Sequence, residues 1–249
     1  MSNGKTQQTV VCMKWGTRYG PEYVNRLASM VRRQTTRPTR FLCFTDDVTG
    51  LSTDIETAPL PPIALPPRMT WSTWRKLSVW QYPLADLEGN VLFLDLDLII
   101  SGPLDDFFDY VPGSFVVIRN WTQLREGIGN TSVFRFPVGR YTRIYEDFVR
   151  DPVAVMRRWR TEQHYISDSI PELAFWPAPW CVSFKHSLLP RWPMNFFRTA
   201  RLPRDAKIVV FTGKPKPDEA LAGRWPTRSP RERIYKHTRP TPWIAEHWR

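Results

Sequence analysis

Residues 91–97 read Val-Leu-Phe-Leu-Asp-Leu-Asp, and this stretch is the most informative part of the chain. Two carboxylates, Asp95 and Asp97, interrupt an apolar run that continues to Ile100. In an extended strand, residues i and i+2 point to the same face, with Cα atoms roughly 6–7 Å apart. The pattern therefore predicts a buried strand that carries leucines on one face and both aspartates on the other.

Two like charges side by side in a buried strand are unfavourable unless a cation lies between them. Hard divalent ions such as Mg²⁺ and Mn²⁺ bind one or two carboxylates and complete their coordination with water and phosphate oxygens. Asp95 and Asp97 are therefore candidate metal ligands, for Mn²⁺ or Mg²⁺, where the strand leaves the sheet. For the Asp-x-Asp pattern alone, a helix cap or a salt bridge to an arginine is the commoner explanation.

The elements on either side of this stretch predict an α/β fold with a parallel sheet. Residues 9–13 read as a strand, residues 21–33 as a helix with Pro21 in its first turn, and residues 40–45 as a second strand. Helical patterns follow at 71–81, 139–160 and 162–170, the second of them broken at Asp151-Pro152. Further strands are expected at 114–118, 131–136 and 208–211. This order favours one domain over residues 9–217, a loosely held N-terminus over 1–8 and an irregular basic tail over 218–249.

The net charge of +11 is concentrated near the C-terminus, where residues 201–249 hold 12 Lys or Arg against 5 Asp or Glu. Such a surface suits nucleic acid, an anionic membrane or a phosphorylated substrate, and a solvated basic surface is the default. No recognised nucleic-acid motif supports the first of these partners. Peripheral contact with an anionic membrane remains open.

The location expected from the sequence is the cytoplasm. The chain has no apolar run of 18 residues, and its N-terminus lacks the apolar core of a signal peptide. Cys12, Cys43 and Cys181 are odd in number and form no Cys-x-x-Cys motif, so buried thiols in a reducing compartment are expected.

Five short motifs occur in an order that resembles a known enzyme family. They are Arg75-Lys76-Leu77, Phe93-Leu94-Asp95-Leu96-Asp97, Asn130-Thr131-Ser132-Val133-Phe134, Glu162-Gln163 and Gly213-x-x-Lys216-Pro217. The series resembles nucleotide-sugar glycosyltransferases of the GT-A type, in particular the family 8-like group of glycogenin and bacterial galactosyltransferases. The resemblance covers roughly residues 9–217. It implies a single Rossmann-like domain with a mixed central sheet, a divalent metal, usually Mn²⁺, and a hexosyltransferase activity with a nucleoside diphosphate sugar donor such as a UDP-sugar.

The resemblance also implies roles for individual residues. Asp97 would bind the metal, and Asp95 would contact the metal or the donor. Asn130 and Ser132 would lie beside the donor sugar, with Ser132 where glycine is usual. Glu162 and Gln163 match an Asp-Gln pair at the reacting centre, with the longer Glu162 in place of aspartate. Gly213 and Lys216 would bind the diphosphate, while Val210 occupies the position of a histidine and so removes one expected metal ligand.

Further donor-binding candidates come from position in the chain. Lys14, Trp15 and Tyr19 follow the first strand, at the sheet edge where α/β proteins bind nucleotides. Asp46 and its neighbour Asp47 end the second strand and would accept hydrogen bonds from a ribose or would form a turn. Arg75 and Lys76 precede the metal strand, where a surface role and donor binding are both open. Among the remaining polar residues, His164 is expected to be a hydrogen-bonded structural histidine, and Asp168 is a candidate acceptor-site carboxylate.

Two classes of function fit these patterns. The first is a metal-dependent glycosyltransferase that moves a sugar from a nucleoside diphosphate donor to a glycan, lipid or protein acceptor. The second is a degenerate GT-A domain that binds a sugar nucleotide or glycan without turnover, an alternative suggested by the valine at position 210. A phosphatase with Asp95 as nucleophile is disfavoured, because that chemistry would place the pair on the first strand of the domain.

Overall fold

The computed structural model describes residues 7–249, so the expectation for residues 1–6 lies outside the described part of the chain. The chain divides into two compact units. Unit 1 contains the described part of Met1–Asn25 together with Thr36–Leu96 and Asp105–Trp176. Unit 2 contains Arg26–Thr35, Asp97–Leu104 and Pro177–Arg249.

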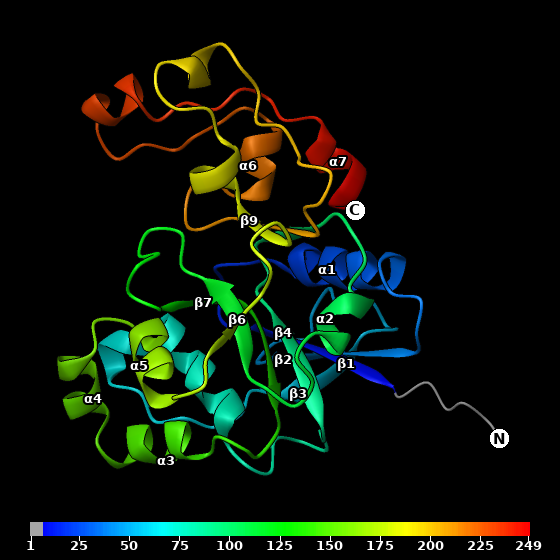
Figure 1. Cartoon of the computed structure of the whole chain (residues 1–249), viewed down its shortest axis with the longest axis vertical. Coiled ribbons are helices and arrows are strands. Elements are labelled where there is room, and N and C mark those ends of the chain that lie inside the picture. The colour runs from blue at the N-terminus through cyan, green and yellow to red at the C-terminus, as the bar shows by residue number, and fades with distance from the viewer. Residues whose placement is uncertain (1–6) are drawn as a thin grey trace. The chain divides into compact units, whose positions relative to one another are not determined.

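Unit 1 is built on a seven-stranded mixed sheet (Figure 1). The strand order is β3 (Glu56–Pro59), β2 (Thr39–Thr45), β1 (Gln8–Lys14), β4 (Asn90–Leu94), β7 (Gly129–Pro137), β6 (Val116–Arg119), β8 (Ala174–Phe175). Strands β1 to β4 run parallel to one another, whereas β7 is antiparallel to both β4 and β6. The start of β7 therefore lies beside the carboxyl end of β4.

The predicted strands at the start of the chain are confirmed, with small shifts at their ends. β1 begins at Gln8, a buried residue, one position before the predicted start. β1 and β4 carry apolar residues on both faces because both faces of the sheet are covered. Aromatic rings fill one side of the sheet: Phe134 stacks on Phe93 at 4.7 Å and on Trp80 at 5.7 Å between ring centroids.

The helices of unit 1 follow the sequence pattern closely. They are α2 (Asp105–Asp109), α3 (Arg143–Arg150), α4 (Pro152–Arg158) and α5 (Glu162–Ser169). The predicted break falls between α3 and α4, where Pro152 opens the second helix and the Asp151 carboxylate accepts from the backbone of Ala154 at 2.9 Å. The segment before the Asp-Leu-Asp motif forms two 3₁₀ helices, η1 (Pro67–Met69) and η2 (Thr73–Trp80), so its helical pattern is shorter and tighter than predicted.

Helix α1 (Pro21–Arg33) matches its prediction in both bounds. Tyr23, Leu27, Met30 and Val31, which the 3.6-residue period places on one face, are all buried. The residues of this helix fall into both units, with the division after Asn25.

Unit 2 contains a three-stranded sheet in the order β5 (Leu98–Ile100), β10 (Ile208–Val210), β9 (Cys181–Ser183). The rest of the unit is mostly irregular, as its prolines predict, with short helical turns along the chain. These are η3 (Phe184–Leu188), η4 (Met194–Phe196), α6 (Pro217–Leu221), η5 (Pro230–Ile234) and α7 (Trp243–His247).

The prediction of one continuous strand through both aspartates is wrong. β4 ends at Leu94 and pairs within the large sheet, whereas β5 begins at Leu98 and pairs with β10 in the small sheet. The chain bends at Leu96 and Asp97, between the end of one strand and the start of the next. The two-residue alternation of a strand therefore does not determine the directions of these carboxylates.

None of the helices in residues 7–249 has the length and apolar character that crossing a bilayer requires.

Candidate functional site

The candidate site in unit 1 lies at the carboxyl edge of the parallel strands. β1 lies between β2 and β4: the chain runs from β1 outward to β2 and β3 on one side, and then returns to place β4 on the other side. Open α/β sheets bind ligands at such a reversal of strand order. Lys14 ends β1 and Asp95 directly follows β4, so both residues lie at this edge.

Asp95 is fixed in place by its backbone and by a buried cation. Its backbone N–H donates to the carbonyl oxygen of Ser132 at 2.9 Å, which extends the pairing of β4 with β7 by one residue. The Lys76 Nζ lies 2.6 Å from Oδ1 and 2.8 Å from Oδ2 of Asp95. Side-chain exposure is 5% for Lys76 and 19% for Asp95. Lys76 is therefore a partner of the Asp-Leu-Asp motif, and the surface role considered from the sequence does not apply to it.

Glu162, at the first position of α5, joins the same group of residues and is 1% exposed. Its Oε2 accepts from the Thr73 hydroxyl at 2.7 Å, and its Oε1 accepts from the Thr131 hydroxyl at 3.3 Å. The carbonyl oxygen of Thr131 accepts from Lys76 at 3.2 Å.

Segments separated by up to 89 residues therefore meet in one hydrogen-bonded network around Thr131. Neither Thr73 nor Thr131 was predicted from the sequence to be a site residue. Thr131 lies inside one of the five motifs, but Thr73 has no signal other than its position before Arg75 and Lys76. In this network the Lys76 ammonium lies between the Asp95 carboxylate and the backbone carbonyl oxygen of Thr131. The hydroxyl of the same threonine donates to the Glu162 carboxylate.

The other predicted residues of this region have local partners. Asn130 is buried, and its Oδ1 accepts from the backbone of Ser132 at 3.1 Å, so the amide shapes the start of β7. The Gln163 Oε1 accepts from the Asn120 amide at 3.4 Å. The Arg75 Nε donates to the carbonyl oxygen of Thr70 at 3.3 Å.

His164 is a hydrogen-bonded histidine, as predicted. Its Nδ1 lies 2.7 Å from the Thr161 hydroxyl, and its Nε2 lies 3.2 Å from the Gln123 amide. Asp168 accepts from the indole N–H of Trp159 at 3.1 Å.

The loop after β1 is held by the two aspartates that follow β2. The backbone N–H of Gly16 donates to Asp46, at 3.0 Å from Oδ2. The Nζ of the buried Lys14 donates to the carbonyl oxygen of Asp47 at 3.3 Å. The turn-forming role that the sequence left open is present at Asp47, whose Oδ1 accepts from the backbone N–H of Thr49 at 2.9 Å. Asp46 instead holds the loop of the neighbouring strand.

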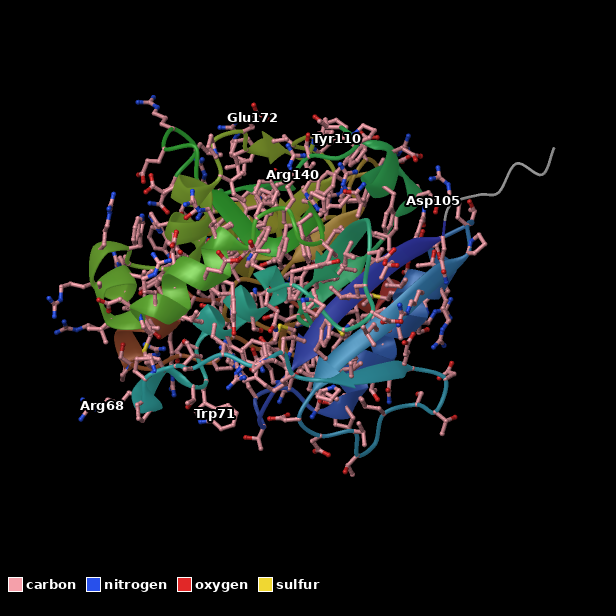
Figure 2. All side chains as sticks on the ribbon, turned by 90° about the horizontal axis from the view of Figure 1, so that it is seen from below. Arg68, Trp71, Asp105, Tyr110, Arg140 and Glu172 are labelled. Carbon is pink, nitrogen blue, oxygen red and sulfur yellow. The ribbon has the colours of Figure 1, made fainter. Side chains whose placement is uncertain are left out.

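Trp71 covers this loop, although the sequence pattern does not single it out. Its indole, 65% exposed, lies on the surface of unit 1 (Figure 2). A Cβ added to Gly16 would lie 2.1 Å from the Trp71 ring, so no side chain fits at position 16 in this arrangement. Gly16 also has a φ of +60°, which favours glycine. Trp15 is partly buried against the core, and Tyr19 packs edge-on against Tyr23 at 5.0 Å.

An open recess of about 610 Å³ lies beside the loop, at the carboxyl ends of β2 and β3. Its lining is Thr45, Asp46, Asp47, Val48, Thr57, Ala58, Pro59 and Leu60. The lining combines two aspartates and two threonines with four apolar residues.

The remaining predicted residues belong to unit 2. The backbone carbonyl oxygen of Asp97 accepts from Phe211 at 3.1 Å, and its side chain is nearly buried. Gly213 has a φ of +81°, and a Cβ added there would have no atom within 4 Å. The backbone N–H of Lys216 donates to Glu219 at 2.7 Å, at the N-terminus of α6. Val210, at the predicted histidine position, is fully buried in β10.

A second lysine contacts the loop after β10. The Lys185 Nζ donates to the carbonyl oxygen of Thr212 at 3.1 Å. Burial, and then the positive charge of Lys236, lower the pKa of Lys185 from its usual value. The neighbouring His186 has a lowered pKa for similar reasons, burial first and then the charge of Lys185.

The donor chemistry of Asp95 and Asp97 fits a hard divalent ion, which needs oxygen ligands and few protein residues. Within residues 7–249, no group of three or more His, Cys, Asp and Glu side chains is arranged to hold a metal. The Lys76 ammonium already contacts both Asp95 oxygens, so a cation at Asp95 would compete with Lys76.

Comparison with solved structures identifies the fold. The galactosyltransferase LgtC, solved in complex with donor and acceptor sugar analogs, superimposes with a TM-score of 0.56 at 14% identity, over 84% of this chain and 89% of that one. The chain has the GT-A fold, as its motifs predicted. The bifunctional glycosyltransferase WbbM matches with a TM-score of 0.58 at 12% identity, over 86% of this chain and 47% of that chain.

The glycosyltransferase GlyE of Streptococcus pneumoniae TIGR4 matches with a TM-score of 0.54 at 14% identity, over 85% of this chain and 56% of that chain. No protein-family sequence model matches the chain, and comparison with functionally curated sequences found no match. At 12–15% identity the likeness establishes the fold, and the chemistry depends on this chain's own residues.

Proposed function

We propose that this protein is a glycosyltransferase that moves a sugar from a nucleoside diphosphate donor, UDP in the simplest case, to an acceptor hydroxyl. The observation that carries the proposal is the position of Asp95, directly after β4 at the reversal of strand order of a GT-A fold. The network of Lys76, Thr131 and Glu162 around it supports the proposal, because a purely structural strand end needs no such set of buried charges.

Asp95 and Asp97 are the residues we propose to hold Mn²⁺ or Mg²⁺, on the basis of their type and their separation by one residue in the sequence. When bound, the ion would offset the charge of the leaving diphosphate. Lys216 would contact the same diphosphate after Gly213, whose backbone leaves space for the phosphate oxygens.

The reaction breaks the bond between the sugar's anomeric carbon and the diphosphate oxygen, and the electron pair leaves with the diphosphate. The acceptor oxygen forms the new bond with the anomeric carbon, and its proton passes to the departing diphosphate. We propose that Glu162 acts at the reacting centre with Gln163, either by stabilising positive charge on the sugar or by orienting the acceptor. The two threonine hydroxyls hold the Glu162 carboxylate in one orientation, which is the preorganisation that such a role requires.

The donor's nucleoside is proposed to lie at the loop after β1, where Lys14, Trp15 and Tyr19 were predicted to bind. The recess of about 610 Å³ and the exposed Trp71 indole support this placement, because a base needs an apolar face and a few polar partners.

The test combines binding with turnover. Thermal unfolding with UDP, with and without Mn²⁺, should show stabilisation of about 2.7 kcal/mol at a ligand excess of about 100 times the dissociation constant. Release of free UDP from UDP-glucose and UDP-galactose is then measured with and without sugar acceptors. Absence of both binding and release for every common nucleoside diphosphate would contradict the proposal.

A second candidate is a domain that binds a sugar nucleotide or glycan without turnover. The Lys76–Asp95 ion pair favours it, because Asp95 is already neutralised without a metal. Val210 also favours this candidate, because a buried valine stands where a metal-binding histidine was expected. UDP binding that is independent of Mn²⁺, together with no UDP release, would select this candidate over the enzyme.

A further inference from the structure

Unit 2 exposes a cluster of large apolar side chains on two segments of the chain, residues 191–198 and 228–239 (Figure 1, yellow and orange-red). Five apolar side chains in these segments are largely exposed: Trp192 60%, Met194 38%, Phe197 71%, Ile234 63% and Tyr235 51%. A single exposed apolar residue needs no explanation, but five within two adjoining segments do.

Specific contacts hold the two segments together. The Trp192 indole N–H donates to the carbonyl oxygen of Ile234 at 2.9 Å. The Asn195 amide, itself buried, donates to the carbonyl oxygens of Tyr235 at 2.9 Å and His237 at 3.0 Å. The Phe196 ring stacks on His237 with centroids 4.4 Å apart. The two segments therefore lie side by side and form one region of the surface of unit 2.

The same surface is strongly basic. Residues 191–198 and 228–239 contain seven Lys or Arg and a single acidic residue, Glu232. The Glu232 Oε1 accepts from Lys236 at 2.6 Å, and its Oε2 accepts from the backbone of Arg228 at 2.7 Å, so its charge is largely offset. Six arginines in the two segments are exposed: Arg191, Arg198, Arg228, Arg231, Arg233 and Arg239.

We propose that this surface, residues 191–198 and 228–239, docks unit 2 on an anionic lipid membrane. The occupant follows from two properties that occur together. The arginines complement anionic headgroups. Trp and Tyr rings favour the headgroup level of a bilayer, and Phe, Ile and Met side chains can enter the acyl boundary. A nucleic acid would complement the positive charge of the arginines, but it offers no apolar environment for the side chains of Met194 and Ile234.

The proposal goes beyond sugar transfer and is independent of catalysis. Membrane docking would bring the enzyme to acceptors held in a lipid surface, while a nucleoside diphosphate donor arrives from solution. Vesicle binding is measured without donor, so its failure would leave the proposed glycosyltransferase activity standing.

The experiment is co-sedimentation of the full chain with vesicles of phosphatidylcholine alone and of phosphatidylcholine mixed with phosphatidylglycerol. Wild type should bind the anionic vesicles only, and binding should weaken with added salt. The variant Arg228→Ser/Arg231→Ser/Arg233→Ser should bind on the order of 100-fold more weakly, from about 1 kcal/mol for each basic residue near the surface. The variant Phe197→Ser/Ile234→Ser should lose at least about tenfold, since both exposed side chains leave the acyl boundary.

Matched controls come from unit 1. Arg125→Ser/Arg143→Ser/Arg157→Ser removes three exposed arginines, and Leu124→Ser/Val153→Ser removes two exposed apolar side chains. Both should bind vesicles like wild type. Thermal unfolding verifies that every variant is folded. Equal binding by wild type and the unit 2 variants, or binding of wild type to single-stranded RNA and not to vesicles, would overturn the proposal.

Discussion

The Nζ of Lys76 lies between the two carboxylate oxygens of Asp95, 2.6 Å from Oδ1 and 2.8 Å from Oδ2. The lysine is carried by η2 and the aspartate directly follows β4, so tertiary packing creates the pair. The ammonium occupies the position at which a cation would bind Asp95. The pair therefore stabilises the free protein and sets a competition for any metal.

We predict that Lys76→Met lowers the free energy of unfolding by about 3 kcal/mol. Removing one partner of a buried ion pair leaves an uncompensated charge, and the 19% exposure of Asp95 places the loss at the lower end of the range for such pairs. Urea unfolding measures it. The double variant Lys76→Met/Asp95→Asn should recover most of the loss, and a double variant as unstable as the single one would argue against the charge explanation.

The same substitution should tighten Mn²⁺ binding in the absence of nucleotide, on the order of tenfold, because a competing positive charge is removed. Isothermal titration of Mn²⁺ into wild type and Lys76→Met tests this. The gain should vanish in Lys76→Met/Asp95→Asn. Unchanged Mn²⁺ affinity in Lys76→Met would show that Asp95 is not a metal ligand.

Asp97→Asn should abolish Mn²⁺-dependent binding of UDP while leaving the fold intact. The reason is the loss of the ligand charge in a metal–diphosphate site that has few protein ligands. Asp205→Asn, which changes an exposed aspartate of unit 2, is the matched control. Wild-type UDP and Mn²⁺ affinities in Asp97→Asn would refute the metal assignment.

Glu162→Gln should lower kcat about 100-fold with little change in the donor KM, because the charge acts mainly in the transition state. Glutamine keeps the shape and can still accept from Thr73 or Thr131. Steady-state kinetics of UDP release provides the measurement, with the exposed Glu172→Gln as control (Figure 2). Equal losses in kcat and in donor affinity would instead indicate a structural role for Glu162.

Lys216→Ala should lower turnover more than it lowers donor binding, by about 10–100-fold in kcat, since the charge it meets grows as the diphosphate leaves. Lys214→Ala in the same loop is the control, because the Lys214 ammonium is paired with Glu219. Comparison of kcat with the dissociation constant for UDP separates the two effects. A larger loss in Lys214→Ala than in Lys216→Ala would reassign the diphosphate lysine.

The stabilisation that Arg40 provides through Glu56 and Asp86, near the edge of the large sheet, should be lost in acid. Hydrogen bonds from Arg40 hold the pKa of Glu56 and of Asp86 below their usual values of 4.5 and 3.8. A carboxylate with a lowered pKa contributes stability above its usual pKa, and this is lost as the pH falls through the folded-state value. Arg40→Gln should therefore lower the urea midpoint at neutral pH, and the difference from wild type should disappear in strong acid. A difference that persists in acid would point to lost packing of the arginine stem.

Much of the fold was predictable because its signals are local. Alternation and apolar runs indicate β1, β2 and β10, Pro21 and the 3.6-residue period indicate α1, and Asp151-Pro152 indicates the break between α3 and α4. The pattern Lys216-Pro217-x-Glu219 also carries the signal of a helix start, because proline suits the first turn and Glu219 accepts from the Lys216 backbone N–H, although α6 was not among the predicted elements.

The sequence by itself determined the α/β class, the main elements and the residue types available for chemistry near the Asp-Leu-Asp stretch, because periodicity and turn residues act within a few positions. Only the tertiary structure decided that β4 stops before Asp95 and that β5 pairs with a different sheet. It also decided that Lys76 neutralises Asp95 and that Thr73 and Thr131 hold Glu162. These outcomes depend on which distant segments satisfy each other's buried charges and hydrogen-bonding groups, and a local sequence pattern carries no information about such partners.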